Sequence, residues 1–453
     1  MKIRKERVFF MNTNISESML SRFSAAFAAD RANQVAQKAV VKSGLSAAAE
    51  NQQEAIDNPM IFSIELETGE VTDQKSSGRC WLFAGLNTLR FEIIKKLNLK
   101  TFELSQNYQM FWDKLEKSNY FLESILDTLD EPTDGRLIQH LISSPIQDGG
   151  QWDMFCALVD KYGCVPKAVM PETFHSSNTG VMNMLITRKL REDALQLREA
   201  HKSGESADAL RARKEDMLSE VYRMLCIALG EPPKTFTFEY RDEDKNYYRD
   251  ENITPLDFMK KYVGRAMDDY VSIINAPTAD KPYWKTYTVQ YLGNVVGGRQ
   301  IKYLNLPSDE LKKLSIAQLS DGQPVWFGCD VGQMLQRDLG IMGMKTFDYE
   351  SLLNVHFGMN KAQRLDYATS LMTHAMVFLG VNLVDGKPTR WKVENSWSEK
   401  SGQKGYYLMT DEWFDEYNYQ IVVNRKYLTP EMQEAFEQEP IVLKPWDPMG
   451  SLA

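Results

Sequence analysis

The chain has 453 residues, of which 25% are charged and 43% are hydrophobic, an ordinary composition for a globular protein. That length is too great for one simple core, so two or three domains are expected. The formal net charge of −9 disfavours non-specific binding to nucleic acid or to an anionic membrane.

The N-terminal segment is basic and then briefly apolar, and polar residues follow Met11. Its apolar part is too short for the core of a signal peptide. No run in the chain approaches the ~20 apolar residues of a transmembrane helix. Met1 and Met11 are both candidates for the natural start.

The five cysteines form an odd set. Cys156, Cys164, Cys226 and Cys329 lie in apolar runs, which favours buried free thiols over disulfides or metal ligands. No pair has the spacing of a zinc site. This usage points to a reducing compartment.

The fifth cysteine, Cys80, lies in a different setting. Residues 16–51 predict helices with a break at Gly44, and the alternating residues 61–66 predict a strand. A glycine-containing loop then leads to Cys80, where apolar residues at helical spacing begin and extend to Phe91. A thiol at the start of a helix lies at the positive end of the helix dipole, which favours the nucleophilic thiolate.

Two further features follow this helix. Ser105 fits the N-cap of a helix that extends to about residue 117. Gly149 and Gly150 precede a helix predicted over residues 153–162. Two adjacent glycines are by themselves only a turn signal.

From about residue 181 to 320 the pattern is mainly helical. Amphipathic helices are predicted over residues 184–200 and 207–229. The methionines in the second helix lie on its apolar stripe, so we interpret them as core filling rather than as part of a cofactor site.

A hairpin is expected after these helices. Residues 235–240 alternate as a strand and a polar, turn-like segment follows. If the hairpin lies at an interface between subunits, Phe236 and Phe238 are the expected contact residues.

The last part of the chain is rich in strand patterns. Residues 324–331 resemble a buried strand, and Asp385 and Gly386 predict a tight turn between two later strands. His374 begins one strand-like run and Asn395 follows another.

His374 and Asn395 are the residue types that Cys80 would need as partners. A thiolate nucleophile works with a base and with a group that orients that base. The remaining histidines show no partner pattern, and we interpret them as ordinary surface or core residues: His140, His175, His201 and His356.

The segment Ser77-Gly78-Arg79-Cys80-Trp81 resembles the C-G-[SA]-C-[WY] signature of papain-type cysteine proteases. Ser77 stands where secreted relatives have a disulfide-forming cysteine. His374 lies 294 residues after Cys80, whereas the papain spacing is about 130–150, so the resemblance requires a large insertion.

An insert-bearing papain relative that ends near Lys444-Pro445-Trp446-Asp447-Pro448 resembles the bleomycin hydrolase family, whose bacterial members are the aminopeptidase C enzymes. The resemblance extends from about Phe23 to Ala453. It implies an α+β, two-lobed papain-like fold with a large helical and hairpin insertion. The implied domains are residues 1–180 and 322–453 of the catalytic domain and residues 181–321 of an inserted oligomerisation region.

The resemblance also implies roles for four residues. Cys80 would be the nucleophile, His374 the acid and base, and Asn395 the residue that orients His374. Gln74, six positions before Cys80, would donate its side-chain amide to the oxyanion, together with the Cys80 backbone N–H. No metal or organic cofactor is required.

Substrate-binding roles are implied for four more. Gly149 and Gly150 would line the cleft, and Trp397 would shield the hydrogen bond between His374 and Asn395. The carboxylate of Ala453 would hold the free amino group of the substrate.

Two charges near Cys80 could favour the thiolate, but we interpret them differently. Lys75 and Arg79 are expected to be exposed loop charges.

The expected protein is therefore a cytoplasmic cysteine aminopeptidase, a hydrolase of peptides with a free N-terminus that forms a homohexamer. The alternative is a non-catalytic or moonlighting ring of protease ancestry that binds nucleic acid or serves as a scaffold. The complete set of four residues and the acidic net charge argue against this alternative, and no membrane partner is expected. The sequence leaves open the side-chain preference, the physiological substrate, the stoichiometry and the boundaries of the insertion.

Overall fold

The structure, a computed structural model, describes residues 14–452, so Met1, Met11 and Ala453 lie outside the described residues. The chain divides into two compact units. Unit 1 comprises Met1–Glu54 and Lys345–Gly358, and unit 2 comprises Ala55–Met344 and Met359–Ala453.

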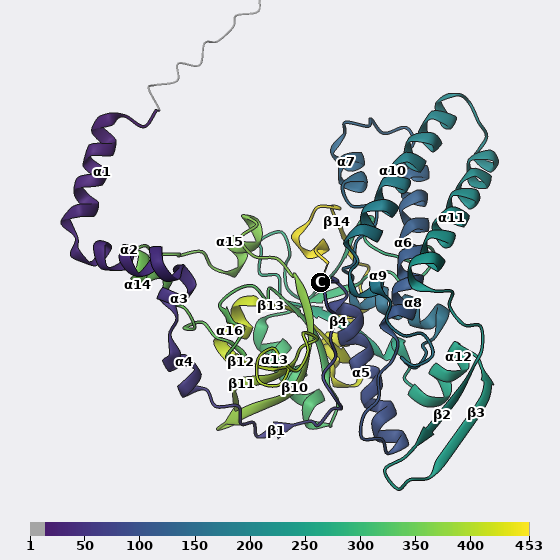
Figure 1. The fold of residues 1–453 in the computed structure, drawn as a ribbon. Helices are drawn as coiled ribbons and strands as arrows, with labels where there is room; N and C mark the ends of the chain where they lie inside the picture. Colours follow the sequence, from purple (N-terminus) through teal and green to yellow (C-terminus); the bar gives the residue numbers. More distant parts are fainter. Residues whose placement is uncertain (1–13, 453) are drawn as a thin grey trace, which may run out of the picture. The chain divides into compact units, whose positions relative to one another are not determined.

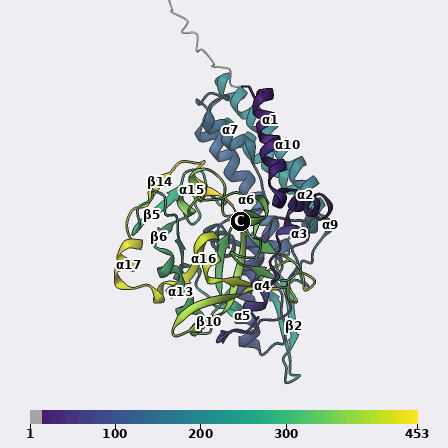
Figure 2. The same cartoon turned by 90° about the vertical axis from the view of Figure 1, so that its left-hand side faces the viewer.

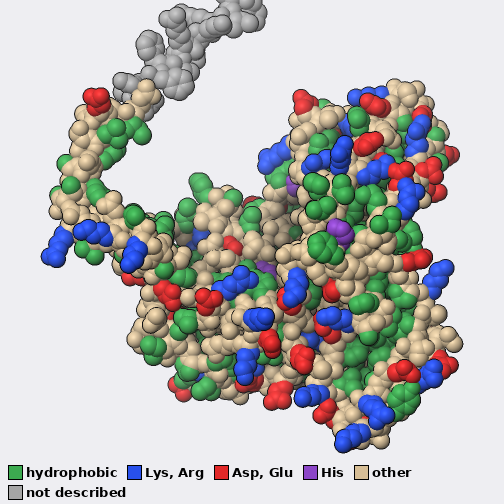
Figure 3. Space-filling model, in the orientation of Figure 1, with side chains coloured by type: hydrophobic (Ala, Val, Ile, Leu, Met, Phe, Trp, Pro, Cys, Tyr) green, Lys and Arg blue, Asp and Glu red, His purple; other side chains and the backbone are tan. Residues whose placement is uncertain are grey.

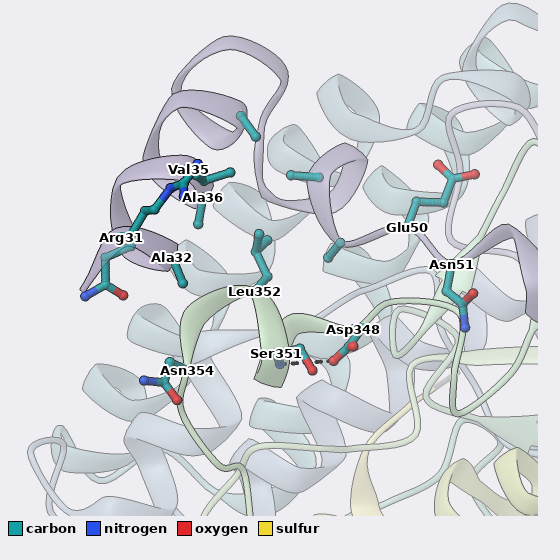
Figure 4. A pocket seen from close by; sticks show the side chains of 14 residues that line it. Arg31, Ala32, Val35, Ala36, Glu50, Asn51, Asp348, Ser351, Leu352 and Asn354 are labelled. Atoms are coloured by element: carbon teal, nitrogen blue, oxygen red, sulfur yellow. Dashed lines mark hydrogen bonds between the residues drawn. The ribbon is translucent and has the colours of Figure 1, made fainter.

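Unit 1 is helical, which confirms the helices predicted over residues 16–51. Its helices are α1 (Glu17–Ala29), α2 (Arg31–Ser43), α3 (Leu45–Ala49) and α14 (Tyr349–Leu353). Ser16 and Asp30 cap α1 and α2, and Gly44 at φ 86° ends α2. Figure 4 shows an open pocket lined largely by alanines of α2 and α3 and by residues around α14.

Unit 2 is built on one mixed sheet. Its strands are β1 (Ile64–Glu65), β4 (Tyr270–Ile274), β5 (Lys285–Val289), β6 (Tyr303–Asn305), β7 (Val325–Cys329), β8 (Leu335–Gln336), β9 (Ile341–Met342), β10 (His374–Val384), β11 (Lys387–Glu394), β12 (Tyr406–Thr410), β13 (Asn418–Asn424) and β14 (Ile441–Leu443). They lie in the order β14-β5-β6-β4-β13-β7-β10-β11-β12-β9-β8. Strand β1 pairs with β10, and Figure 1 shows the two side by side.

The hairpin of β10 and β11 sets the positions of two predicted site residues. Asp385 and Gly386 make its turn with φ of 51° and 77°, as the sequence predicts. Val377 pairs with Glu394 in the ladder. Therefore the start of β10 and the end of β11 lie at the same end of the hairpin, and these carry His374 and Asn395.

Helices cover the sheet and form a separate layer beside it (Figures 1 and 2). They are α5 (Cys80–Leu97), α6 (Gln106–Asp127), α7 (Arg136–Ser143), α8 (Trp152–Tyr162), α9 (Phe174–Ser177), α10 (Gly180–Lys202), α11 (Ala207–Leu229), α12 (Pro255–Phe258), α13 (Ser308–Ser320), α15 (Lys361–Asp366), α16 (Asp411–Tyr417) and α17 (Pro430–Phe436).

Helix α5 is the central helix of unit 2. It packs on α6 and α8 on one side and on β10 and β7 on the other, so its first three turns are buried nearly all round. Gly85 allows this approach, because a Cβ there would lie 2.8 Å from the ring of Phe155.

Ser105 caps α6, as predicted, since its hydroxyl accepts a hydrogen bond from the Tyr108 N–H at 3.0 Å. The helix extends to Asp127 rather than ending near residue 117. No glycine or proline interrupts the chain there, and Phe121, Leu122 and Ile125 continue the buried stripe.

Within residues 181–321, α10, α11 and the hairpin of β2 (Phe236–Arg241) and β3 (Tyr247–Ile253) lie outside the large sheet. Strands β4, β5 and β6 instead belong to it, because β4 pairs with β13 and β5 with β14. Figure 3 shows hydrophobic side chains on the surface over the hairpin and α12. No helix in the described chain is long and apolar enough to cross a bilayer.

Candidate active site

The site is assembled where α5 meets the start of β10. Helix α5 begins at Cys80, as predicted, and Cys80 is only 2% exposed. Burial raises the pKa of its thiol to about 11, although backbone hydrogen bonds at Ala375, Trp81 and Cys80 itself act in the opposite direction. The contact with Ala375 brings the sulfur next to the residue that follows His374.

His374 and Asn395 form the predicted pair. Nε2 of His374 lies 2.9 Å from Oδ1 of Asn395, and both side chains are buried. The same Oδ1 accepts the backbone N–H of Ser396 at 2.8 Å. An atom that accepts from Ser396 is the amide oxygen, so Nε2 of His374 must carry the hydrogen and Nδ1 is left with a free lone pair.

The surroundings keep His374 neutral. Burial lowers its pKa to about 4, the positive charge of Arg337 acts in the same direction, and the hydrogen bond with Asn395 opposes both. The ring of Trp397 lies 4.9 Å from that of His374, and the Arg337 guanidinium lies 4.2 Å from the centre of the Trp397 ring. Nothing near Arg337 in the sequence pointed to this position.

Both polar atoms of the Gln74 side-chain amide make hydrogen bonds. Its Oε1 accepts the Ser396 hydroxyl at 2.7 Å, and its Nε2 donates to the Ser77 carbonyl at 2.7 Å. Its backbone N–H also donates to the Ser396 carbonyl. The Ser77 carbonyl takes one of the two Nε2 hydrogens, and the other has no acceptor among residues 14–452.

The prediction for Arg79 is wrong. Its side chain is 1% exposed and donates to both carboxylate oxygens of Glu172, at 3.0 and 2.8 Å. Its Nε donates to the Ser77 hydroxyl at 2.9 Å. The cation therefore braces the loop before Cys80 from inside the protein, whereas Lys75 is exposed as predicted and pairs with Asp73.

Gly149 and Gly150 lie against the first turn of α5. A Cβ on Gly150 would lie 2.5 Å from the indole of Trp81, so this glycine is required by Trp81 within the protein itself. The Trp81 Nε1 donates to the Asp148 carbonyl at 2.6 Å. The Gly149 carbonyl accepts from Lys117 at 2.7 Å.

The described end of the C-terminal arm lies near the glycine loop and the start of β10 (Figures 1 and 2). The Ser451 carbonyl accepts from Nε2 of Gln151 at 2.6 Å, and the Ser451 hydroxyl donates to the Met372 carbonyl at 2.6 Å. Gln151 follows Gly150, and Met372 is two residues before His374. The described arm therefore reaches between the glycine loop and the start of β10, and Ala453 lies outside the described residues.

Two contacts fix the arm further back. The Arg136 guanidinium lies 4.0 Å from the centre of the Trp446 ring, so a cation–π contact holds Trp446. The buried Lys281 pairs with Asp447 at 3.0 Å.

No cluster of three or more possible metal ligands occurs in the described part of the chain. All five cysteines are free thiols. The site combines a buried thiol at the start of a helix, which contacts the residue after His374, with an imidazole that an asparagine orients. That combination defines the class of cysteine peptidases.

The comparisons agree with this class. The model of the Peptidase C1-like family matches residues 14–450. Aminopeptidase C of Listeria innocua is 51% identical over 447 residues, which cover 98% of this chain and 100% of the relative. Human bleomycin hydrolase is 47% identical over 399 residues, or 86% and 88% of the two chains.

A solved structure gives the same result for the fold. The crystal structure of PepW from Lactobacillus rhamnosis has a TM-score of 0.97 and 54% identity, and the match covers 98% of this chain and 100% of that one. The chain belongs to the Peptidase C1-like family. The predicted α+β papain-like fold and the predicted resemblance to aminopeptidase C and bleomycin hydrolase are confirmed.

Proposed function

We propose that the protein is a cysteine aminopeptidase, which removes residues from the N-termini of peptides. The observation that carries the proposal is the position of Ser451, bound to Gln151 and Met372 at the two sides of the site. An arm in that position leaves little room for a peptide that extends past the site in the N-terminal direction. The relatives named aminopeptidase C support the same activity.

In the first half of the reaction, Nδ1 of His374 takes the proton of the Cys80 thiol, and the sulfur attacks the carbonyl carbon of the first peptide bond. The carbonyl electrons move to the oxygen, which accepts hydrogen bonds from the free Nε2–H of Gln74 and from the Cys80 backbone N–H. The C–N bond then breaks as Nδ1 returns its proton to the leaving amine. The product is a thioester on Cys80 and a peptide shortened by one residue.

In the second half, Nδ1 of His374 takes a proton from water, and the resulting hydroxide attacks the thioester. The C–S bond breaks, the amino acid leaves, and the proton returns to the sulfur. Asn395 keeps the ring oriented throughout, because its oxygen only accepts and so fixes the hydrogen on Nε2. Trp397 covers the imidazole and keeps water from this hydrogen bond.

The arm supplies the selectivity in this proposal. Its terminal carboxylate, on Ala453, pairs with the substrate's free ammonium group in a charge-assisted hydrogen bond. Gly149 and Gly150 line the opposite side, where the backbone of Gly150 makes no hydrogen bond within residues 14–452 and can pair with the substrate backbone.

We further propose that the enzyme works as a homohexamer in the cytoplasm. Residues 181–321 are the proposed oligomerisation insertion between catalytic parts 1–180 and 322–453. Its helices α10 and α11 and its β2–β3 hairpin, which lie outside the large sheet, are the contact elements in this proposal.

The scaffold alternative has no specific observation in its favour. Basic and acidic side chains are interspersed on the face of unit 2 that Figure 3 shows. The hydrogen bonds that orient Gln74, His374 and Asn395 support the enzymatic interpretation instead.

The test is Cys80→Ala, with Cys156→Ala as the matched control. We expect Cys80→Ala to keep its fold by circular dichroism and to lose roughly 10³-fold or more of its turnover of a free-amine dipeptide substrate. Cys156 lies in the core on α8, so its replacement should lower stability but leave turnover intact. Wild-type turnover by Cys80→Ala would refute the proposed function.

A further inference from the structure

Asp148 has no role in the chemistry described above, yet its carboxylate accepts four hydrogen bonds beside the site. Its side chain is 10% exposed. Each oxygen accepts two hydrogen bonds. The donors are the Gly78 N–H at 2.9 Å and the Thr179 hydroxyl at 2.6 Å on Oδ2, and the Lys114 ammonium at 2.7 Å and the Asn183 amide at 2.8 Å on Oδ1.

Asp148 joins the two segments that face the substrate. Through Oδ2 it holds the N–H of Gly78, which lies in the loop between the two oxyanion donors, Gln74 and Cys80. Through its own carbonyl it holds the Trp81 indole N–H at 2.6 Å, and Gly149 follows it directly. Gly78 allows the close contact, because a Cβ there would lie 3.0 Å from the Cβ of Asp148.

The other three donors form a rigid support behind the carboxylate. Lys114 on α6 is fully buried, and Thr179 and Asn183 come from the start of α10. With every lone pair occupied, the carboxylate cannot rotate without breaking a hydrogen bond. Burial raises the pKa of Asp148, but the Lys114 charge and the hydrogen bonds outweigh it and hold that pKa well below its usual range.

Activation of the Cys80 thiol does not explain why the Asp148 carboxylate lies beside the site. A negative charge near Cys80 disfavours the thiolate, and Asp148 indeed raises the pKa of Cys80 slightly. Asp148 therefore has a role other than activation of the thiol. Its contacts with Gly78 and Trp81 indicate which segments it holds in place.

We propose that Asp148 is a positioning residue. It holds the loop between Gln74 and Cys80 and the loop of Gly149 and Gly150 in fixed positions relative to each other. It acts on the reaction only through Gly78 and Trp81. This inference rests on the proposed peptidase function.

The experiment is Asp148→Asn in the full chain. This variant keeps the shape of the side chain, but an NH₂ group replaces one carboxylate oxygen and cannot accept hydrogen bonds from the surrounding donors. We expect kcat/KM for a free-amine dipeptide to fall about 10- to 100-fold, mainly in kcat. Alkylation of Cys80 by iodoacetamide should stay within about threefold of wild type, because that reaction forms no oxyanion. A peptide aldehyde, whose addition product resembles the tetrahedral intermediate, should lose affinity roughly in proportion to kcat/KM.

Glu116→Gln is the matched control. Glu116 is a buried carboxylate on the same helix as Lys114, and it pairs with Lys161 at 2.5 Å, away from Gly78 and Trp81. It should lower stability without a change in kcat/KM. If Asp148→Asn fails to fold because Lys114 is left unpaired, the double variant Lys114→Met/Asp148→Asn removes both charges and should show the same kinetic split.

Two results for Asp148→Asn would overturn the inference. One is a kcat/KM close to that of wild type. The other is an equal loss of hydrolysis and of Cys80 alkylation, which a purely structural role of Asp148 predicts. A wild-type protein without Cys80-dependent hydrolysis would instead refute the proposed function.

Discussion

Asn395 fixes the proton of the site with a single atom. Its Oδ1 accepts from the Ser396 N–H and from Nε2 of His374. The Ser396 contact prevents the amide from presenting its NH₂ group to the ring. A neutral His374 therefore has its basic lone pair on Nδ1, the nitrogen that does not face Asn395.

The pH profile follows from the burial of Cys80 and His374. Burial raises the pKa of Cys80 to about 11 and lowers that of His374 to about 4, so it disfavours both the doubly protonated and the fully deprotonated pair. Between these limits the pair holds one proton and is active.

We expect a bell-shaped pH profile of kcat/KM. Activity should rise with pH along an acid limb below the ordinary histidine value of ~6.5, and fall along an alkaline limb above the ordinary thiol value of ~8.5. Initial rates across this range give the two limbs. A profile that only rises through pH ~8.5 would indicate an independent thiol instead.

Arg90 and Glu394 form a buried ion pair behind the site. Their atoms are 2.5 Å apart, and both side chains are 1% exposed. Asn87 and Thr68 also donate to Glu394, each at 2.8 Å. The pair connects α5, which carries Cys80, to the residue before Asn395.

We expect Arg90→Met to lower the free energy of unfolding by about 3–5 kcal/mol, because Glu394 stays buried without its cation. Urea denaturation measures the change. The double variant Arg90→Met/Glu394→Gln should recover much of the loss, since no uncompensated charge remains. Equal losses in the single and double variants would show that the charge is not the cause.

The sequence could propose Cys80 from a local motif, Gln74 from its offset to that motif, and His374 and Asn395 as partners from the resemblance to papain-type proteases. It could not predict the contacts of Arg79, since its partner Glu172 lies far along the chain and only the folded structure brings the two together. The same holds for Arg337 and Trp397.

At the scale of elements, sequence periodicity predicted the bounds of one long helix, α11, but ended α6 about ten residues too early. Helix α11 has the predicted bounds, 207–229. Short strands such as β8 and β9, of two residues each, are defined by their pairing partners rather than by a pattern of their own. The assignment of β4, β5 and β6 to the large sheet depends likewise on pairing with β13 and β14, late in the chain.

The β2–β3 hairpin shows what an alternating sequence pattern cannot predict about a strand. Phe238, an expected interface residue, is 5% exposed and packs on Phe258 and Tyr262 of its own chain, with ring centres 5.0 and 4.9 Å away. Alternation identifies a buried face but not what buries it. The exposed aromatic residues of the hairpin are Tyr247 and Tyr248, at 55% and 42%.

If the hairpin contributes to a hexamer, Tyr247→Glu/Tyr248→Glu should shift sedimentation velocity toward smaller species. Phe238→Ala is the comparison, and it should cost about 3–5 kcal/mol of stability by loss of core packing. A double-glutamate variant that sediments like wild type would place the subunit contacts elsewhere.

At the scale of the whole molecule, the described end of the chain contacts Gln151 and Met372, which lie close in sequence to the Gly149 and Gly150 loop and to His374. Deleting Gly450 to Ala453 removes the contacts of Ser451 with Gln151 and Met372. We expect the truncated enzyme to lose activity on free-amine peptides and to gain activity on N-acetylated or internal bonds, because the obstruction and the terminal carboxylate are both gone. The ratio of kcat/KM for free and acetylated forms of one peptide measures this.

Ser451→Ala is the control for the truncation. It loses only the hydroxyl contact with Met372 and keeps the arm, so the preference for a free amino group should remain. A truncated enzyme that still prefers free amino groups would show that selectivity resides in another part of the site.

The separation of His374 from Cys80, 294 positions along the chain, has a consequence for synthesis of the protein. A ribosome completes the thiol and its helix long before it makes the imidazole, the amide of Asn395 or the closing arm. A growing chain therefore has no assembled peptidase site while its own unfolded segments are most open to cleavage. We therefore expect hydrolysis by a chain to begin only after Asn395 and the arm have been made.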